Sequence, residues 1–350
     1  MNENDKTDII VIGAGPVGLF TVFEAGLLGL KCVLIDNLDK IGGQCAELYP
    51  EKPIYDIPGV PFQTAEEHVG ALLEQIRPFD YSVHLNERVD SITERPATEG
   101  KSSTWTVTTS EGNTFSAHNV FIAAGAGSFE PRRPPNIENP DKFLNKGVAY
   151  SVREKKLYAN KDVVIFGGGD SALDWSVELA HQARSLTLVH RRDDFRGAPN
   201  TEKLMQDLVA EEKITLKTPY VIEELSGDKT ITGVSLKNFE TKEIETLLCD
   251  EIIFLFGLNK KLGPIVDWNL ELENKKILVD TEKFETNIEG IFAVGDINEY
   301  PGKLDLILCG FHETTLAVQH AFKRCFPGER VPFGYTTSNT KLQKKLGVTE

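Results

Sequence analysis

The chain of 350 residues contains few cysteines, and their spacing fits neither a metal site nor a redox dithiol. Scattered single thiols without a C-x-x-C pair are typical of a protein kept in a reducing compartment. His312-Glu313 begins the H-E-x-x-H zinc pattern, but Leu316 stands where the second histidine belongs. We interpret this pair as a helical surface pair or as a neighbour of a cofactor. The five cysteines are Cys32, Cys45, Cys249, Cys309 and Cys325.

The sequence also lacks an uninterrupted hydrophobic run of membrane-spanning length. The apolar stretch from Ile9 to Ile35 is interrupted by glycines, by Pro16 and by Glu24, and it changes from strand-like to helix-like and back. The first residues, MNENDKTD, have neither the basic part nor the apolar part of a secretory signal. We therefore expect a cytoplasmic protein without membrane contact.

The chain has fewer basic than acidic residues. Lysine and arginine number 38 against 53 aspartates and glutamates, which gives a net charge of −15 and argues against a nucleic-acid partner. The composition, 40% hydrophobic and 26% charged, is typical of a globular protein, and the length suffices for two domains.

A first glycine-rich motif occupies Gly13–Gly18 and has the form G-x-G-x-x-G. It lies between an expected strand, Asp8–Ile12, and an expected helix, Val17–Leu28, and a second strand is expected at Lys31–Ile35. Asp36 stands eighteen residues after Gly18, where a carboxylate accepts hydrogen bonds from ribose hydroxyls. The motif therefore predicts a dinucleotide site for a ribose with a free 2′-hydroxyl. Its binding residues are Gly13, Gly15, Pro16, Gly18 and Asp36.

A second motif occupies 167–172, between an expected strand, Asp162–Phe166, and an expected helix, Ala172–Ala183. Arg191 and Arg192 follow the next expected strand, Ser185–His190, where the first motif has an acid. Guanidinium groups bind phosphate in a bidentate manner, so this site is expected to hold NADP(H) rather than form a merely solvated basic turn. Its predicted residues are Gly167, Gly169, Asp170, Ser171, Ala172, His190, Arg191, Arg192 and Arg196.

Changes in composition indicate where one domain interrupts another. The expected strand Asn119–Ala123 runs into a glycine-rich turn, and the proline-rich segment Pro131–Pro135 follows it. A further strand stops at Gly257, and a strand over Gly290–Asp296 precedes a helix over Leu306–Cys325. We predict an α/β fold of two Rossmann-like, three-layer ββα domains. Residues 128–257 form the NADP domain, inserted into a domain made of 1–127 and 258–350, with a C-terminal extension from about 327.

Several further segments support a resemblance over nearly the whole chain. They are Ile41–Gln44, Leu48–Lys52, Tyr55–Gly59, Gly167–Trp175, His190–Arg192, Gly295-Asp296 and Pro301–Glu313. Their order and spacing resemble those of the thioredoxin reductase-like flavoproteins, and among these the ferredoxin–NADP+ reductase branch. The resemblance implies FAD in the first domain, a ferredoxin or flavodoxin partner and a homodimer. It also implies that the NADP domain rotates about hinges near Gly127 and Gly257.

The same resemblance implies how the flavin is held. Asp296 would hydrogen-bond the ribityl chain, Tyr49 and Tyr335 would stack on opposite faces of the isoalloxazine, and hydroxyls of Thr336, Thr337 or Ser338 would lie near N5. Aromatic rings in these places bury the flavin and favour offset stacking. The remaining FAD-binding residues that it implies are Gln44, Val89, Gly125 and Thr337.

The electron acceptor is predicted from missing thiols. The dithiol of a thioredoxin reductase would fall at 150–153, where neither Tyr150 nor Arg153 is a cysteine. Cys45 occupies the first position of a C-x4-C pair, but Pro50 occupies the second. We therefore expect electron transfer between NADP(H) and ferredoxin. The alternatives are a monothiol disulfide reductase that uses Cys45, a diaphorase or oxidase, and a non-catalytic redox sensor.

An acidic ferredoxin would require basic surface on this acidic protein. We expect that surface to be drawn from Lys52, Arg132, Arg133, Lys260, Lys261, Lys341, Lys344 and Lys345.

Overall fold

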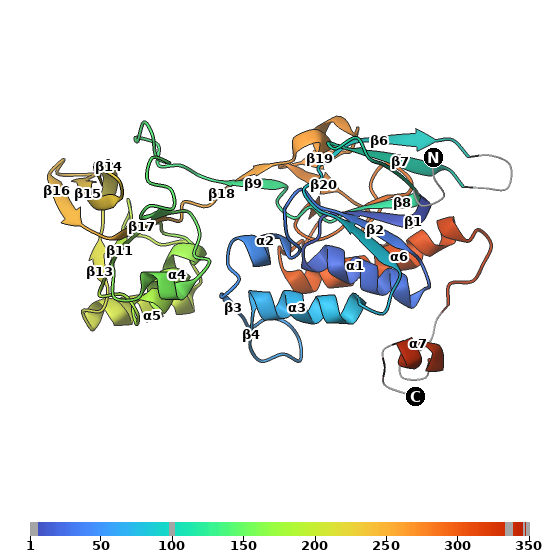
Figure 1. Cartoon of the computed structure of the whole chain (residues 1–350), viewed down its shortest axis with the longest axis horizontal. Helices are drawn as coiled ribbons and strands as arrows, with labels where there is room; N and C mark the ends of the chain where they lie inside the picture. The colour runs from blue at the N-terminus through green and yellow to red at the C-terminus, as the bar shows by residue number, and fades with distance from the viewer. Residues whose placement is uncertain (1–5, 98–101, 333–338, 346, 348–350) are drawn as a thin grey trace. The chain divides into compact units, whose positions relative to one another are not determined.

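The computed structural model describes residues 6–97, 102–332, 339–345 and 347. The chain divides into two compact units (Figure 1): unit 1 consists of Met1–Ser128 and Lys260–Glu350, and unit 2 of Phe129–Asn259. The two segments that join the units, β9 (Ser128–Pro131) and β18 (Leu258–Lys261), pair with each other. Unit 2 is thus an insertion in the chain of unit 1.

Unit 1 is built on a seven-stranded mixed sheet. Its central strand is β1, which pairs in parallel with β2 on one side and with β8 on the other. The long strand β8 pairs antiparallel with β7 at its beginning and in parallel with β21 at its end. In spatial order the strands are β5 (Tyr81–His84), β2 (Cys32–Ile35), β1 (Lys6–Ile12), β8 (Thr114–Ile122), β7 (Thr104–Thr109) and β6 (Val89–Arg95), with β21 (Ile291–Ala293) beside β8.

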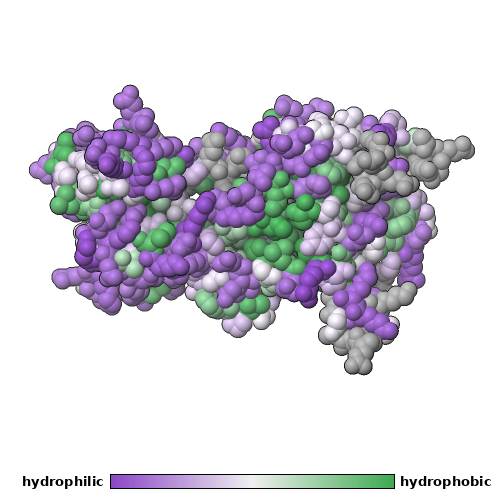
Figure 2. All heavy atoms as spheres, in the orientation of Figure 1, coloured by the Kyte–Doolittle hydropathy of each residue, from purple (hydrophilic) through white to green (hydrophobic). Residues whose placement is uncertain are grey.

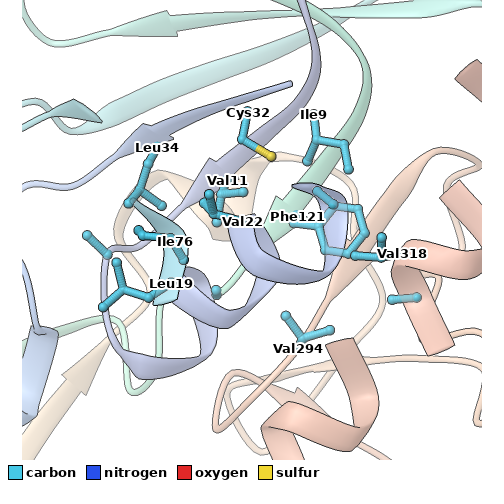
Figure 3. Packing of buried hydrophobic residues seen from close by; sticks show 14 of the residues in the cluster. Ile9, Val11, Leu19, Val22, Cys32, Leu34, Ile76, Phe121, Val294 and Val318 are labelled. Carbon is cyan, nitrogen blue, oxygen red and sulfur yellow. The ribbon is translucent and has the colours of Figure 1, made fainter. Parts of the chain in front are cut away.

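Both faces of this sheet are covered, which explains why β2 and the last four residues of β1, Ile9–Ile12, are continuously apolar rather than alternating. Three helices, α1 (Pro16–Leu27), α3 (Ala65–Ile76) and α6 (Ile307–Cys325), cover one face and share a core with it. Figure 3 shows side chains of that core converging from these helices and from β1, β2 and β8. On the opposite face, side chains of the sheet strands, β6 and β7 among them, share a second core with the 3-10 helix η3 (Gly263–Asp267).

Shorter elements complete unit 1. Thr64 caps α3 through a reciprocal pair of hydrogen bonds with Glu67: the Thr64 side chain accepts from the Glu67 N–H, and the Glu67 carboxylate accepts from the Thr64 N–H. The remaining elements are α2 (Gly43–Glu47), β3 (Pro53–Ile54), β4 (Gln63–Thr64), β19 (Leu272–Glu273), β20 (Lys276–Leu278), β22 (Asn298–Glu299) and α7 (Thr340–Lys345).

Unit 2 repeats the three-layer plan with a five-stranded parallel sheet. The sheet consists of β10 (Val148–Ala149), β17 (Glu251–Phe254), β11 (Asp162–Phe166), β12 (Ser185–Val189) and β13 (Thr215–Lys217), in that order. The antiparallel strands β14 (Tyr220–Gly227), β15 (Ile231–Asn238) and β16 (Ile244–Leu248) form a second sheet, and residues of β14 and β15 share a core with the first. The helical elements are α4 (Asp170–Leu179), α5 (Pro199–Ala210) and η2 (Lys155–Tyr158).

The predicted fold class is confirmed, since each unit has the ββα layering of a Rossmann-like domain. The expected strands and helices around both glycine motifs are present, and α6 begins one position after the residue predicted. The helix expected over Ala172–Ala183 begins earlier, at Asp170, because Gly169 is its N-cap. It ends at Leu179, where the chain turns, because the Gln182 and Ala183 N–H groups both bond back to the Leu179 carbonyl.

Within the described part of the chain, no helix combines the length and the apolar character that crossing a bilayer requires.

The core of unit 1 gives a direct stability prediction. Phe121 is fully buried in β8 and stacks on Phe292, with ring centroids 4.8 Å apart. We expect Phe121→Ala to lower the free energy of unfolding by about 3–5 kcal/mol, because the lost contacts leave a cavity. Denaturant unfolding of the purified variant measures the loss. Phe239→Ala, which truncates an exposed ring, is the control and should change stability little.

Candidate functional site

The first glycine turn joins β1 to α1 and brings its backbone into close approach at two places. Gly13 has φ +111°, and a Cβ there would lie 2.4 Å from the Ala123 carbonyl oxygen. A Cβ at Gly18 would lie 1.9 Å from the carbonyl oxygen of Gly13. A side chain at Gly13 would therefore collide with the backbone that follows β8, and one at Gly18 would force α1 away from the turn.

The N-terminus of α1 is not capped by a side chain. Its N-cap residue is Gly15, its first turn contains Pro16, and it has no acidic residue there. The backbone N–H groups of the first turn are thus left for an external acceptor, and the positive end of the helix dipole lies beside them. This arrangement suits a pyrophosphate.

Asp36 lies at the end of β2 and is joined directly to the glycine turn. One oxygen of its carboxylate accepts from the Ala14 N–H at 2.6 Å, and the other accepts from the Leu38 N–H at 2.8 Å. Burial raises the pKa of this carboxyl above its ordinary value, while the two backbone donors oppose part of that rise. The acid predicted to bind ribose is therefore fixed in orientation beside the turn.

The short helix α2 lies against the same turn. The Gly42 N–H donates to the Ala14 carbonyl at 2.9 Å. A Cβ at Gly125 would lie 3.3 Å from Nε2 of Gln44. The structure therefore brings together the first turn, Gln44 and Gly125, all of which were predicted to bind one cofactor.

Tyr49, Cys45 and Asp296 form a second part of the site. The Tyr49 hydroxyl and the Cys45 thiol share a hydrogen bond, and the charge of Asp296 raises the pKa of both groups. Burial is the larger cause and raises the pKa of Cys45 to about 11. The Lys52 ammonium lies 5.7 Å from the centroid of the Tyr49 ring. Tyr49 is thus anchored at its hydroxyl, and a cation lies over its ring.

The turn that carries Asp296 contacts two helices at once. A Cβ at Gly310 in α6 would lie 3.3 Å from the Cα of Gly295 and 2.4 Å from Cγ2 of Val17 in α1. Gly310 therefore allows α6, α1 and the turn to meet. Figure 2 shows hydrophobic residues gathered on this part of unit 1, where α1 and α2 begin, with hydrophilic residues around them.

Sequence reasoning missed the side chains that hold this turn. Glu313 was interpreted as part of a surface pair or as a cofactor neighbour, and the surface interpretation is wrong, because Glu313 is completely buried. Its carboxylate accepts from the Gly295 N–H at 2.6 Å and from Lys303 Nζ at 2.5 Å. No short motif links these positions, so only the folded chain shows that they meet.

The remaining predicted flavin contacts are Val89 and residues near the C-terminus. The Val89 side chain is buried in the core on the face of the sheet opposite to α1, so any contact with a ligand would involve its backbone. Tyr335, Thr336 and Thr337, like Ser338, lie outside the residues that the structure describes.

The second glycine turn, in unit 2, joins β11 to α4. A Cβ at Gly167 would lie 2.6 Å from the Leu255 carbonyl oxygen, and one at Gly168 would lie 2.2 Å from Cε1 of His190. The N-cap of α4 is Gly169, which has no side chain to cap the helix, and Asp170 and Ser171 follow in its first turn. The buried Ala172 packs beneath the turn. The backbone of this turn therefore approaches neighbouring atoms as closely as the backbone of the first glycine turn does.

The segment that follows β12 folds back onto this turn. The Arg196 N–H donates to the Gly168 carbonyl at 2.7 Å, and the Ala198 N–H donates to the Asp170 carboxylate at 2.8 Å. His190 stacks on Phe195 with centroids 5.2 Å apart. Burial lowers the pKa of His190, and its arginine neighbours lower it further. Those neighbours, Arg191, Arg192 and Arg196, are exposed, so a basic cluster borders the second turn.

Comparison with known proteins identifies the family of the chain. The family model of the pyridine nucleotide-disulphide oxidoreductases matches residues 7–321. The chain therefore belongs to the pyridine nucleotide-disulphide oxidoreductase family. It is 51% identical over 348 residues to a ferredoxin–NADP reductase of Nitrobacter hamburgensis, with 99% of this chain and 100% of the relative covered. A ferredoxin–NADP reductase of Bradyrhizobium diazoefficiens is 47% identical, with both chains covered completely.

Among solved structures, thioredoxin reductase from Lactococcus lactis is similar with a TM-score of 0.74 and 26% identity, covering 91% of this chain and 98% of that one. Thioredoxin reductase from T. acidophilum has a TM-score of 0.76 at 20% identity, over 92% and 99% of the two chains, and shows the shared fold.

The first glycine turn can be tested by adding one methyl group. We expect Gly18→Ala to lower FAD content on purification at least about tenfold, because the methyl group collides with the Gly13 carbonyl and displaces the α1 N–H groups. The flavin absorbance-to-protein ratio measures this loss. Gly70→Ala, in α3 with open space around it, is the matched control. Equal FAD content in both variants would contradict the assignment of the turn.

Proposed function

We propose that the protein is a ferredoxin–NADP+ oxidoreductase that holds FAD in unit 1 and NADP(H) in unit 2. The observation that carries the proposal is the contrast between two similar turns: a half-buried carboxylate adjoins the first, and an exposed arginine cluster adjoins the second. Relatives about 50% identical over the full chain, named ferredoxin–NADP reductase, support the same activity.

The residues of unit 1 fit FAD. The uncapped α1 N-terminus accommodates the pyrophosphate, and Asp36 is fixed where a ribose hydroxyl would bind. Gln44 and Gly125 lie near the same turn, and Asp296 lies near Tyr49, whose ring we propose stacks on the flavin. We propose Val89, Tyr335, Thr336 and Thr337 as further contacts on the basis of the family resemblance.

The residues of unit 2 fit NADP(H). Arg191 and Arg192 are exposed at the end of β12, free to form bidentate hydrogen bonds with a 2′-phosphate, and Arg196 lies in the segment bonded to the glycine turn. Burial and the neighbouring arginines lower the pKa of His190, which favours its neutral form. No carboxylate takes the place that Asp36 has in unit 1.

FAD, when bound, accepts two electrons as a hydride from NADPH and passes them on singly to a one-electron carrier. The chemistry requires no acid–base group from the protein. The protein binds and orients the two cofactors, and Tyr49 shields the flavin from water. Burial keeps the Tyr49 hydroxyl protonated, since it raises the pKa of that group.

Thiol chemistry is less well supported than ferredoxin reduction. The positions of a thioredoxin reductase dithiol are occupied by Tyr150–Arg153, and the Tyr150 hydroxyl donates to Asp141 at 2.8 Å. Cys45 is buried, and its raised pKa keeps it as a thiol at neutral pH, whereas the thiolate is the nucleophile. A disulfide substrate would therefore meet an unreactive sulfur.

The electron carrier is ferredoxin or flavodoxin, and either would dock on basic residues at the surface of this protein. Of the proposed basic residues, Arg133 is engaged with Asp141 at 2.9 Å and lies over the Tyr150 ring, so it contributes little free charge. Lys344 and Lys345 lie in α7, and Lys345 contacts the ring of Phe79. We further propose that the protein is a cytoplasmic homodimer without a nucleic-acid or membrane partner.

Steady-state reduction of purified ferredoxin tests the proposal. NADPH should support turnover and NADH should support at least about tenfold less, because only NADPH carries the phosphate that the arginine cluster binds. Turnover should fall as salt is raised, since screening weakens docking of an acidic carrier. Dye or oxygen reduction without ferredoxin or flavodoxin reduction would instead indicate a diaphorase or oxidase.

Coenzyme selectivity has its own test. We expect Arg191→Ala/Arg192→Ala to raise KM for NADPH about tenfold or more and to leave KM for NADH unchanged, because the lost guanidinium groups contact only the 2′-phosphate. Arg184→Ala is the control, since Arg184 is also exposed in unit 2 but pairs with Asp162 and Asp250. An equal loss with both coenzymes would place the phosphate elsewhere.

Cys45 provides a pH-dependent test. A pKa of about 11 leaves Cys45 on the order of a hundredfold less thiolate at pH 8 than an ordinary cysteine has. Iodoacetamide labelling of Cys45, followed by mass spectrometry, should be slow at pH 8 and should accelerate as pH approaches 11. Cys45→Ser should keep ferredoxin reduction, whereas a monothiol disulfide reductase would lose its activity.

A further inference from the structure

The peptide groups on both sides of Gly295 are bonded to charged, buried side chains. The Gly295 N–H donates to Glu313 at 2.6 Å, and the Gly295 carbonyl accepts from Lys303 Nζ at 3.0 Å. Lys303 and Glu313 are themselves paired at 2.5 Å, with side-chain exposures of 1% and 0%. The two members of one ion pair therefore bond to the N–H and to the carbonyl of the same glycine.

The remaining hydrogen-bonding capacity of Glu313 is directed to the same loop. Nδ2 of Asn298 donates to Oε2 of Glu313 at 2.8 Å, and the Tyr300 hydroxyl donates to Oε1 at 3.0 Å. Burial keeps Tyr300 a protonated donor by raising the pKa of its hydroxyl. Since α6 carries Glu313, this network ties the loop from Gly295 to Lys303 to that helix.

This network sets the orientation of the peptide group between Gly295 and Asp296. The Gly295 carbonyl and the Asp296 N–H belong to one planar group and point in opposite directions. A lysine bonded to the carbonyl therefore fixes the plane of that group, so that the Asp296 N–H points away from Lys303. It also polarises the peptide, which makes the Asp296 N–H a stronger donor.

We propose that Lys303 and Glu313 are positioning residues, which orient the Gly295–Asp296 peptide so that its N–H and the Asp296 carboxylate bind the flavin. This inference rests on the proposed FAD site. A buried ion pair is costly to desolvate and is a poor source of stability alone, so a positioning role accounts for its presence.

The pair also places two opposite charges beside the proposed flavin site. With both present, their fields largely cancel. Lys303→Met leaves the Glu313 charge unbalanced and should make the flavin midpoint potential more negative, because reduced flavin carries more negative charge. Glu313→Gln leaves the Lys303 charge and should shift the potential in the positive direction. If the pair only stabilised the fold, the two variants would not shift the flavin midpoint potential in opposite directions.

The experiment measures FAD affinity and midpoint potential of the full-length protein. Both single variants should raise the FAD dissociation constant about tenfold, as expected for one lost buried charged hydrogen bond at the site. Lys303→Arg, which keeps charge and donor, should recover most of the affinity. Unchanged affinity in both variants, or potentials that shift in the same direction, would overturn the proposal.

Unit 1 offers a matched control at the opposite end of β21. There Glu285 is buried, accepts from the Gly290 N–H at 2.7 Å and pairs with Lys283 at 2.8 Å. Lys283→Met and Glu285→Gln therefore remove the same kind of contact from the same strand. We expect them to lower thermal stability without changing FAD affinity or potential. Changes as large as those at Lys303 and Glu313 would contradict a specific role.

A double variant covers the case in which a single unbalanced charge prevents folding. Lys303→Met/Glu313→Gln leaves no unpaired charge, so it should keep the wild-type potential but bind FAD about tenfold more weakly. Wild-type FAD affinity in this variant would overturn the proposal. These measurements need neither NADPH nor ferredoxin, so failure of ferredoxin reduction would reject the proposed function without affecting this result.

Discussion

The structure depends on one close backbone approach, at the turn between β1 and α1. Because Gly18 has no side chain, the first turn of α1 lies against the Gly13 carbonyl, and the other parts of the site are placed relative to it. Asp36 bonds to the Ala14 N–H, and the Gly42 N–H bonds to the Ala14 carbonyl. The site is thus a set of segments, distant in sequence, that converge on one turn.

Unit 2 contains the same kind of turn but a different electrostatic environment. In unit 1 a half-buried carboxylate accepts from backbone donors, whereas in unit 2 exposed arginines lie near a histidine whose pKa burial and these charges lower. A carboxylate repels a ribose phosphate and guanidinium groups attract it, and on this ground we propose different dinucleotides for the two similar folds. Cys45 is buried, and its raised pKa keeps it as a thiol, so it lacks the thiolate that disulfide chemistry requires.

Local patterns predicted the ββα fold and the turns, because continuous apolar strands, glycine spacing and the following charge are all encoded within about 30 residues. The network of Glu313, Lys303 and Gly295 was not predictable, because its members are ordinary residues that only the packing of α6 brings together. The end of α4 was missed because a turn stops it without a proline or glycine. The roles of Val89 and Tyr335 remain predictions from resemblance.

The central claim is that electrons pass from NADPH through FAD to a one-electron carrier. An anaerobic stopped-flow experiment on the FAD-loaded protein follows the flavin absorbance through both halves of this transfer. NADPH should bleach the flavin, NADH at the same concentration should not, and oxidised ferredoxin or flavodoxin added afterwards should restore the colour. A flavin that NADPH bleaches but that only oxygen or a small disulfide restores would contradict the account.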